Sequence, residues 1–148
     1  MTIKRLGGQD VLRSGVIPIL EENGKTYAYC MIPSNVNFGG DKPQMAKGHL
    51  EEGYSILENA LKESGEEIGL IQENVCNIRF VGVFHKIAVF ACNVKDKNQW
   101  KDFEWETSWA GWVDITDDAS RIRDFQQEIF IKAKEIMEEK FEDFKQAL

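Results

Sequence analysis

The sequence lacks the features that mark membrane-spanning, secreted and nucleic-acid-coating proteins. No hydrophobic run approaches the roughly 20 apolar residues of a membrane span, and the amino terminus shows no signal-peptide-like apolar stretch. Basic residues are outnumbered, with 18 Lys and Arg against 25 Asp and Glu, so the formal net charge is −7. Such a balance disfavours a protein that coats nucleic acid or an anionic membrane. We therefore expect a cytoplasmic protein whose partners include no membrane and no extended nucleic acid.

Cysteine is also scarce. The three cysteines, Cys30, Cys76 and Cys92, form no C-x-x-C pair. An odd number without such a pair argues against a disulfide framework and against a structural zinc site. We predict three reduced thiols that pack as small hydrophobic side chains.

The chain does contain enough apolar material for one folded domain. Hydrophobic residues make up 43% of the 148 residues and aromatic residues 11%. A chain of this length buries roughly two-thirds of its unfolded surface, which supports a core without disulfide or metal staples. There is no internal repeat and no linker rich in Pro or Ser. We predict a single domain over residues 1–148.

Hydrophobic periodicity predicts an order of strands, helix, strands and helix. The expected strands are 15–20, 26–32, 79–83, 86–94 and 104–113, and the expected helices are 55–68 and the segment from 119 onward. Asn23-Gly24 has the chemistry of a hairpin turn, and Pro18 indicates an edge strand or a bulge. This order is typical of the α/β class, with a mixed sheet covered by helices.

The last predicted helix is amphipathic. Its apolar residues fall on one broad arc at 100° per residue, and glutamates lie opposite. The arc consists of Phe125, Ile129, Phe130, Ala133, Ile136, Met137, Phe141 and Phe144. Ile131 breaks the pattern and is predicted to be exposed. Much of the excess acid in the chain is thus explained as a solvated helix face.

Three other glutamates are harder to explain as solvation. Glu63, Glu66 and Glu67 stand at i, i+3 and i+4, so a helix directs all three carboxylates within an arc of about 100°. Each close like-charge pair costs about 0.2–0.5 kcal/mol on an exposed helix. Gly65, between them, costs about 1 kcal/mol relative to alanine. Violations of local rules concentrate at functional sites, which makes this stretch the main candidate.

Converging carboxylates attract a hard divalent cation with oxygen ligands, and Mg²⁺ fits that description. Magnesium keeps waters and bridges phosphate oxygens, so a carboxylate cluster fed by a loop with Gly48 and Gly53 suggests phosphate chemistry. A solvated acidic helix face is the alternative. The E-x-x-E-E spacing alone does not decide between them.

The stretch from Gly48 to Leu70 resembles the Nudix box, G-x5-E-x7-R-E-U-x-E-E-x-G-U, where U is aliphatic. Six of its nine specified positions match, namely Gly48, Glu63, Glu66, Glu67, Gly69 and Leu70. Tyr54, Lys62 and Ser64 depart from it, at the positions of the first Glu, the Arg and an aliphatic residue. The Lys47-Gly48-His49 entry resembles members that act on dinucleotides, and residues 38–48 resemble bacteriophage-encoded members.

The resemblance implies the Nudix α/β/α sandwich and hydrolysis of a nucleoside diphosphate linked to another group, such as ADP-ribose, FAD or a dinucleoside polyphosphate. It implies that Glu63, Glu66, Glu67 and the Gly48 carbonyl hold Mg²⁺ or Mn²⁺. It also implies that Glu63 or Glu66 accepts a proton from the attacking water. A metal neutralises a pyrophosphate and acidifies a bound water, which agrees with this chemistry.

The departures from the box have their own consequences. Tyr54 supplies no carboxylate, and Lys62 lacks the planar fork of arginine. Glu58, four residues before Lys62, is placed to form a helical ion pair with it, and Glu51 or Glu52 is a substitute for the missing carboxylate.

Further candidates lie outside the three glutamates. Lys47 and His49 flank the glycine of the loop and are candidates for contacts with a substrate phosphate. Glu104 and Glu106 would share one strand face, and the resemblance makes Glu106 the candidate for an additional carboxylate at the substrate. The tryptophans at 100, 105, 109 and 112 are candidates for stacking on a base, although aromatic residues more often form a core or a dimer contact.

Three functional hypotheses follow. The first is the metal-dependent pyrophosphohydrolase described above, and the second is a nucleoside triphosphate pyrophosphatase of the sanitising type. The third is a nucleotide-binding module of the same fold with weak catalysis, which the substitutions at Tyr54 and Lys62 would permit. The sequence leaves open whether the chain forms a homodimer.

Overall fold

The structure is a computed structural model that describes the backbone of residues 1–147 and the side chains of residues 1–139. Phe141 and Phe144, assigned above to the apolar arc of the last helix, lie outside the described side chains. The strands are β1 (Lys4–Leu6), β2 (Gln9–Val11), β3 (Arg13–Glu22), β4 (Lys25–Pro33), β5 (Gly48–His49), β6 (Val75–Phe84), β7 (Ile87–Val94) and β8 (Thr107–Asp114). The α-helices are α1 (Ile56–Ile68) and α2 (Gln127–Ala147), and 3₁₀ turns cover Val36–Phe38, Gln72–Asn74 and Asp124–Gln126.

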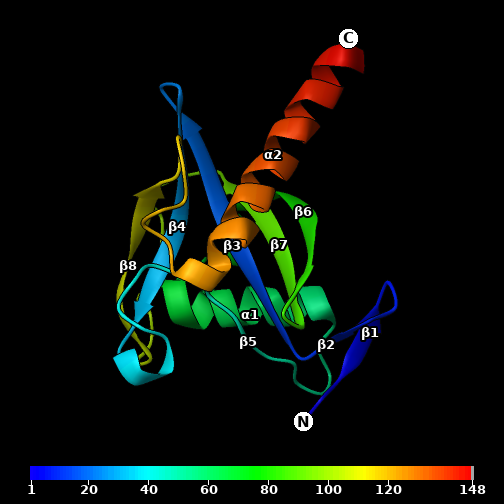
Figure 1. Ribbon diagram of the computed structural model, residues 1–148, viewed down its shortest axis with the longest axis vertical. Helices are drawn as coiled ribbons and strands as arrows, with labels where there is room; N and C mark the ends of the chain where they lie inside the picture. The colour runs from blue at the N-terminus through cyan, green and yellow to red at the C-terminus, as the bar shows by residue number, and fades with distance from the viewer. Residues whose placement is uncertain (148) are drawn as a thin grey trace.

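A mixed six-stranded sheet forms the middle layer. Its order is β6-β7-β3-β4-β8, with β5 paired to the beginning of β3. β3 and β7 are parallel, whereas β3–β4, β4–β8, β6–β7 and β3–β5 are antiparallel. Figure 1 shows α2 crossing one face of this sheet and α1 lying behind the other. The predicted α/β/α sandwich with a mixed sheet is therefore confirmed.

Each helix covers its own hydrophobic core. Under α2 lies a large cluster that includes Ile17, Val89 and Phe130, all fully buried. Under α1 lies a smaller one with Ala60 and Ile68. Ile131, predicted to point away from the core, is 46% exposed. The N-terminal hairpin β1–β2 stands apart as a two-stranded sheet at one corner of the molecule, and the sequence patterns did not predict it.

Local sequence explains where α1 begins and ends. Ser55 accepts a hydrogen bond from the Glu58 amide, and the Glu58 carboxylate accepts one from the Ser55 amide, which completes a capping box. At the other end Gly69 adopts the left-handed conformation, φ 74°, that terminates many helices. The predicted helix over 55–68 is thus confirmed, with Ser55 as its cap.

The prediction for Pro18 is wrong, because β3 is a central strand and not an edge strand. Pro18 is tolerated because the two ladders of β3 exchange at this point. The pairing with β7 ends at Pro18, and the pairing with β4 begins at Ile19. A missing amide hydrogen therefore costs the sheet little here.

Two predicted boundaries are also wrong. Residues 101–106 form a loop before β8, so Glu104 and Glu106 do not share a strand face. Residues 119–123 are not α-helical, and α2 begins at Gln127. Phe125 lies in the preceding 3₁₀ turn and is 39% exposed, because its ring contacts His85 and the guanidinium of Arg123 instead of the core. Tertiary contacts decided all of these positions.

Candidate active site

The carboxylates of α1 face the short strand β5. Gly48 begins this strand and pairs with Ser14 of β3, which fixes it beside the helix. A Cβ atom at Gly48 would lie 2.1 Å from the Glu63 carboxyl carbon, so only glycine leaves room for that carboxylate. The first residue of the box and its central glutamate are therefore in direct contact.

Burial perturbs two of the three glutamates. Removal from water, followed by the negative charge of Glu66, raises the pKa of Glu63 to about 7. Burial also raises the pKa of Glu67 to about 8, although the Lys47 amide donates a 3.3 Å hydrogen bond to that carboxylate. The positive charges of the protein therefore do not offset the cost of ionising these two carboxyl groups away from water.

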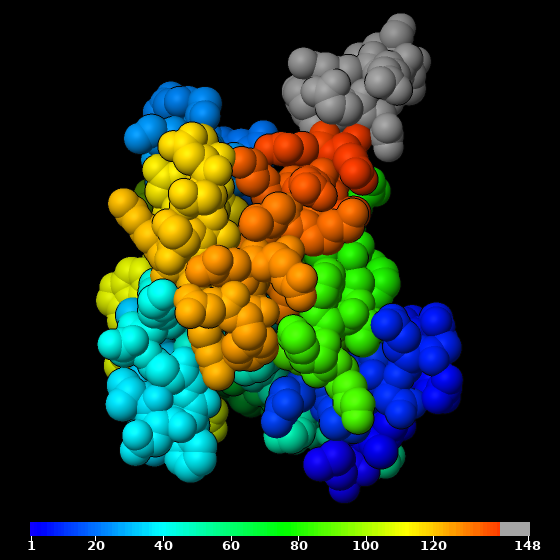
Figure 2. Space-filling view, in the orientation of Figure 1, coloured from blue at the N-terminus to red at the C-terminus, as the bar shows by residue number. Residues whose placement is uncertain are grey.

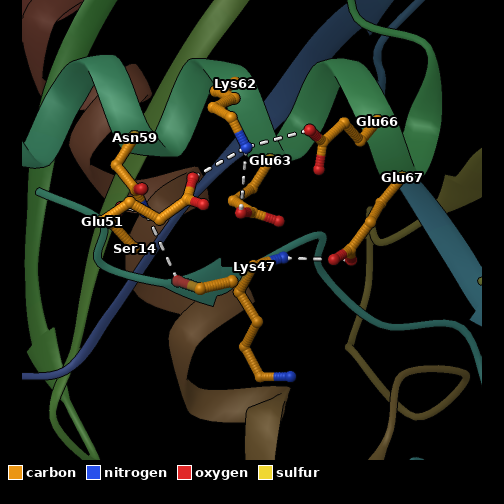
Figure 3. A network of polar contacts seen from close by, with 9 residues as sticks. Ser14, Lys47, Glu51, Asn59, Lys62, Glu63, Glu66 and Glu67 are labelled. Atoms are coloured by element: carbon orange, nitrogen blue, oxygen red, sulfur yellow. Dashed lines mark hydrogen bonds and ion pairs between the residues drawn. The ribbon is translucent and has the colours of Figure 1, made fainter. Parts of the chain in front are cut away.

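Lys62 is the cation of α1 that lies beside the glutamates. Its Nζ lies 2.8 Å from a Glu51 carboxylate oxygen, 3.0 Å from Glu66 and 3.8 Å from Glu63. These contacts, led by the hydrogen bonds to Glu51 and Glu66, raise the pKa of Lys62. Figure 3 shows the ammonium at the centre of this group of carboxylates.

Glu51 supplies the carboxylate partner of Lys62 that Tyr54 cannot supply. The Tyr54 ring centroid lies 5.8 Å from the Lys62 ammonium, a cation–π distance, and no carboxylate stands at that position. The expected Glu58–Lys62 ion pair is wrong, because Glu58 is engaged with Ser55 in the capping box. Sequence spacing misassigned the partner because capping and pairing compete for one carboxylate.

Gly65 serves packing and does not contact the carboxylates. It is buried, and a Cβ there would meet the Lys101 ammonium at 3.2 Å and the Leu70 carbonyl at 3.4 Å. The loop before β8 crosses the helix end here, with the Glu104 amide donating to the Glu66 carbonyl at 2.8 Å. Gly65 therefore faces the loop before β8.

The residues present fit a divalent cation. Glu63 and Glu67 offer partly buried carboxylates with raised pKa values, and the absence of a Cβ at Gly48 lets its backbone approach Glu63. As the side chains lie, no three acidic, histidine or cysteine residues among those described form a ready metal cluster. Glu66 turns to Lys62 and Glu67 to the Lys47 amide, because like charges separate toward the nearest donors.

The other predicted site residues lie around this centre. The Lys47 ammonium points away from the helix in Figure 3, and burial lowers the pKa of Lys47. His49 is exposed on β5, its Nε2 3.5 Å from a guanidinium nitrogen of Arg13. Glu106 lies in the turn before β8, where its charge helps to raise the pKa of both Glu63 and Glu67.

The four tryptophans fall into different environments. Trp100 stacks on Tyr29 with centroids 3.6 Å apart, and Trp112 packs edge-on against the same ring at 5.0 Å. Both indole N–H groups donate to the Lys97 carbonyl. These two rings are structural. Trp109 is 41% exposed on β8, and Trp105 is 81% exposed in the loop before it.

Asn59 is a residue of this site that the sequence patterns did not predict. This fully buried residue of α1 donates to the Ser14 hydroxyl at 3.0 Å and, at 3.5 Å, to the Gly48 carbonyl. Its Oδ1 atom has no hydrogen-bond partner in the described part of the chain. An amide between the apolar positions Ile56 and Ala60 was the available signal, since buried polar groups in helices usually have a structural partner.

Comparisons with known proteins place this geometry in a familiar fold. An Ap4A hydrolase from C. elegans in a binary complex is similar over 92% of this chain and 99% of its own, with TM-score 0.65 and 16% identity. A NUDIX hydrolase-like protein from Listeria monocytogenes is similar over 87% and 95%, with TM-score 0.67 and 18% identity. A Nudix hydrolase from M. smegmatis, RenU, is similar over 85% and 86%, with TM-score 0.67 and 9% identity.

Comparisons of sequence give no such result. No family model matches the chain, and no curated protein matches it either. The likeness is therefore one of three-dimensional structure. The chain has the Nudix fold, as the box-like stretch predicted.

Proposed function

We propose that this protein is a metal-dependent pyrophosphohydrolase that cleaves a nucleoside diphosphate linked to another group, of the ADP-ribose, FAD or dinucleoside polyphosphate class. The observation that carries the proposal is the trio Glu63, Glu66 and Glu67 on one helix beside Gly48, with the carboxyl groups of Glu63 and Glu67 partly buried. A solvated acidic face would leave such groups in water. The Nudix fold and the likeness to an Ap4A hydrolase support the same chemistry.

In this proposal Glu63, Glu66, Glu67 and the Gly48 carbonyl hold Mg²⁺ or Mn²⁺. The bound metal supplies charge neutralisation at the pyrophosphate and lowers the pKa of a coordinated water. Glu63 or Glu66 accepts the proton of the attacking water, a role open to a carboxylate within reach of the bound water. Glu51, through Lys62, keeps Glu66 and Glu63 oriented.

Basic and acidic residues around the trio are proposed to contact different parts of the substrate. The charges that act on Lys47 are Glu67, Arg123 and Arg13, so two cations besides Lys47 itself lie near this position. We assign Lys47 and His49 to contacts with substrate phosphate and Glu106 to the substrate beside Glu67. The described helices include none long and apolar enough to cross a membrane, and we propose that the protein works in the cytoplasm.

The test is hydrolysis of a nucleotide panel with Mg²⁺ or Mn²⁺. The panel holds diadenosine tetraphosphate, ADP-ribose, FAD and nucleoside triphosphates, and the phosphate-bearing products are measured. We expect cleavage of a diphosphate-linked compound, and a loss of about 100-fold or more in Glu67→Gln, comparable to removing one charge-stabilising group elsewhere. Water labelled with heavy oxygen then identifies the phosphorus that is attacked.

A matched control separates chemistry from folding. Glu139 is an exposed glutamate of α2, on the opposite face of the sheet, so Glu139→Gln removes the same charge without touching the site. We expect Glu139→Gln to retain wild-type rates. Pyrophosphate release from triphosphates alone would favour the sanitising hypothesis, and nucleotide binding without turnover would favour the binding module. Equal rates in both variants would contradict the assignment of Glu67.

A further inference from the structure

A cavity of about 390 Å³ opens beside Glu67. Its lining combines charged and apolar residues. Lys47, Glu67 and Glu106 are charged, and Met31 and Met45, both almost fully buried, are apolar. The volume lies in the range of small-molecule sites, and an apolar cavity with a few charged groups is the usual form of such sites.

Two unusually exposed aromatic rings line the same cavity. Phe38 is 85% exposed and Trp105 is 81% exposed, and both contribute to its wall. Among the described residues, neither ring packs against another aromatic ring, in contrast to Trp100 and Trp112. Large apolar groups left in water at one cavity are typical of a binding surface.

The segments that carry the two rings are held in place. The Ser34 hydroxyl donates to the Trp105 carbonyl at 2.6 Å, and the Ser34 amide donates to the Glu106 carbonyl at 2.8 Å. On the Phe38 side, the Gln44 side chain donates to the Gly39 carbonyl at 2.6 Å. The backbone is therefore organised before any ligand arrives, which lowers the entropy cost of binding. In Figure 2 the segment of Phe38 forms a projecting lobe at one corner of the molecule.

We infer that this cavity binds the planar aromatic base of the nucleotide substrate against the rings of Phe38 and Trp105. The inference rests on the proposed function, because Lys47 and Glu67, to which that proposal assigns phosphate and metal, line the same cavity as the two rings. A base stacked on the rings keeps its attached phosphates within the cavity that these residues line. Every base has a π face, so stacking selects a nucleotide over a base-free phosphate without reading one base alone.

The test measures binding without metal and without turnover. Tryptophan fluorescence of the full chain is titrated with AMP, and with ribose 5-phosphate as the base-free control. We expect AMP to quench the fluorescence and ribose 5-phosphate to leave it unchanged. Trp105→Ala and Phe38→Ala should each weaken AMP binding by about 10-fold, the magnitude of a lost base–aromatic stack. Isothermal calorimetry gives the affinity of Trp105→Ala independently of its fluorescence.

Two exposed aromatic residues outside the cavity serve as matched controls. Trp109 of β8 is 41% exposed and Phe80 of β6 is 46% exposed. We expect Trp109→Ala and Phe80→Ala to bind AMP like the wild type. Equal affinity for AMP and ribose 5-phosphate would overturn the inference, as would unchanged AMP binding in both Trp105→Ala and Phe38→Ala.

The outcome is separable from that of the proposed function. A chain that binds AMP through Phe38 and Trp105 but hydrolyses no nucleotide would contradict the proposed function and leave the base site supported. A chain that hydrolyses nucleotides with unchanged KM in Phe38→Ala and Trp105→Ala would support the proposed function and contradict the base site. The KM values for a nucleoside triphosphate and for tripolyphosphate, measured side by side, provide that second comparison.

Discussion

At the scale of single residues, the most informative contact is the 2.8 Å ion pair between Lys62 and Glu51. Lys62 stands where the Nudix box has arginine, and a lysine ammonium has no fixed fork to hold two carboxylates. The protein instead surrounds that ammonium with Glu51, Glu66 and Glu63. The carboxylate missing at Tyr54 is thus supplied from three positions earlier in the chain.

In the proposed function, Glu51 is a positioning residue for Glu63 and Glu66, and Glu51→Gln tests this role. Losing this partner frees Lys62 to shift toward Glu63 and Glu66, so we expect kcat to fall by about 10-fold while stability changes by less than about 1 kcal/mol. Steady-state kinetics against substrate and against Mg²⁺ measure the effect. Adding Tyr54→Glu to Glu51→Gln should restore part of the rate, because it returns a carboxylate to the box position.

Glu52 provides the comparison for this experiment. It is exposed, adjacent in sequence and equal in charge, and the described contacts pair Lys62 with Glu51 and not with it. Equal rates in Glu51→Gln and Glu52→Gln would refute a positioning role for Glu51.

At the scale of elements, the two glycines near the end of α1 have opposite roles. A Cβ at Gly65 meets the end of the flexible Lys101 side chain at 3.2 Å, which a small movement of that side chain relieves. A Cβ at Gly69 would lie 1.9 Å from the Lys101 carbonyl oxygen, and Gly69 has φ 74°. The loop before β8 is packed on the helix at both positions. At Gly65 the nearest backbone atom, the Leu70 carbonyl oxygen, lies 3.4 Å from the Cβ, an ordinary van der Waals distance, whereas at Gly69 the clash is with backbone.

Alanine at these two glycines should therefore shift stability in opposite directions. We expect Gly65→Ala to stabilise by about 0.5–1 kcal/mol, since alanine is the better helix former. Gly69→Ala should destabilise by more than about 1–2 kcal/mol, the cost of a left-handed conformation before the backbone clash is added. Urea unfolding of the metal-free chain measures both. A destabilised Gly65→Ala would show that Lys101 is fixed in place and that the packing at Gly65 is tighter than its side chain suggests.

At the scale of the whole molecule, the partly buried carboxyl groups of Glu63 and Glu67 make the stability of the fold depend on pH and on bound metal. The pKa values of Glu63 and Glu67, about 7 and about 8, lie above the ordinary value of 4.5. Between pH 4.5 and about 8 the folded chain therefore holds protons that the unfolded chain has released. The free energy of unfolding then falls as pH rises through this window.

We accordingly expect the metal-free protein to melt at a lower temperature at pH 8.5 than at pH 5.5. Each kcal/mol corresponds to about 2–4 °C for a chain of this size. Glu67→Gln should flatten this dependence, because the uncharged side chain has no proton to lose. Mg²⁺ or Mn²⁺ should raise the melting temperature most at high pH. Thermal unfolding in EDTA and in metal, at both pH values, tests this, and parallel pH profiles for Glu67→Gln and the wild type would contradict it.

The sequence by itself determined the parts of the protein that depend on local spacing. Helical periodicity predicted α1 and the exposure of Ile131, and hydrophobic alternation predicted the core strands. The box-like stretch predicted that Gly48 lies beside the acidic helix, and it predicted the Nudix fold. These features were predictable because the periods of a helix and a strand, and the chemistry of a cap, act within a few residues.

Only the tertiary structure decided which residues meet across the chain. Pairing of Lys62 with Glu51 depends on how the loop after β5 folds back, and the exchange of ladders at Pro18 depends on the order of strands. The shared cavity of Phe38 and Trp105 joins two loops 67 positions apart in the sequence. Contacts over such separations are set by packing and charge in three dimensions. A pattern along the sequence does not tell which distant residues come close together. The acidic trio was thus readable from its spacing, whereas its counter-charge and the cavity beside it were not.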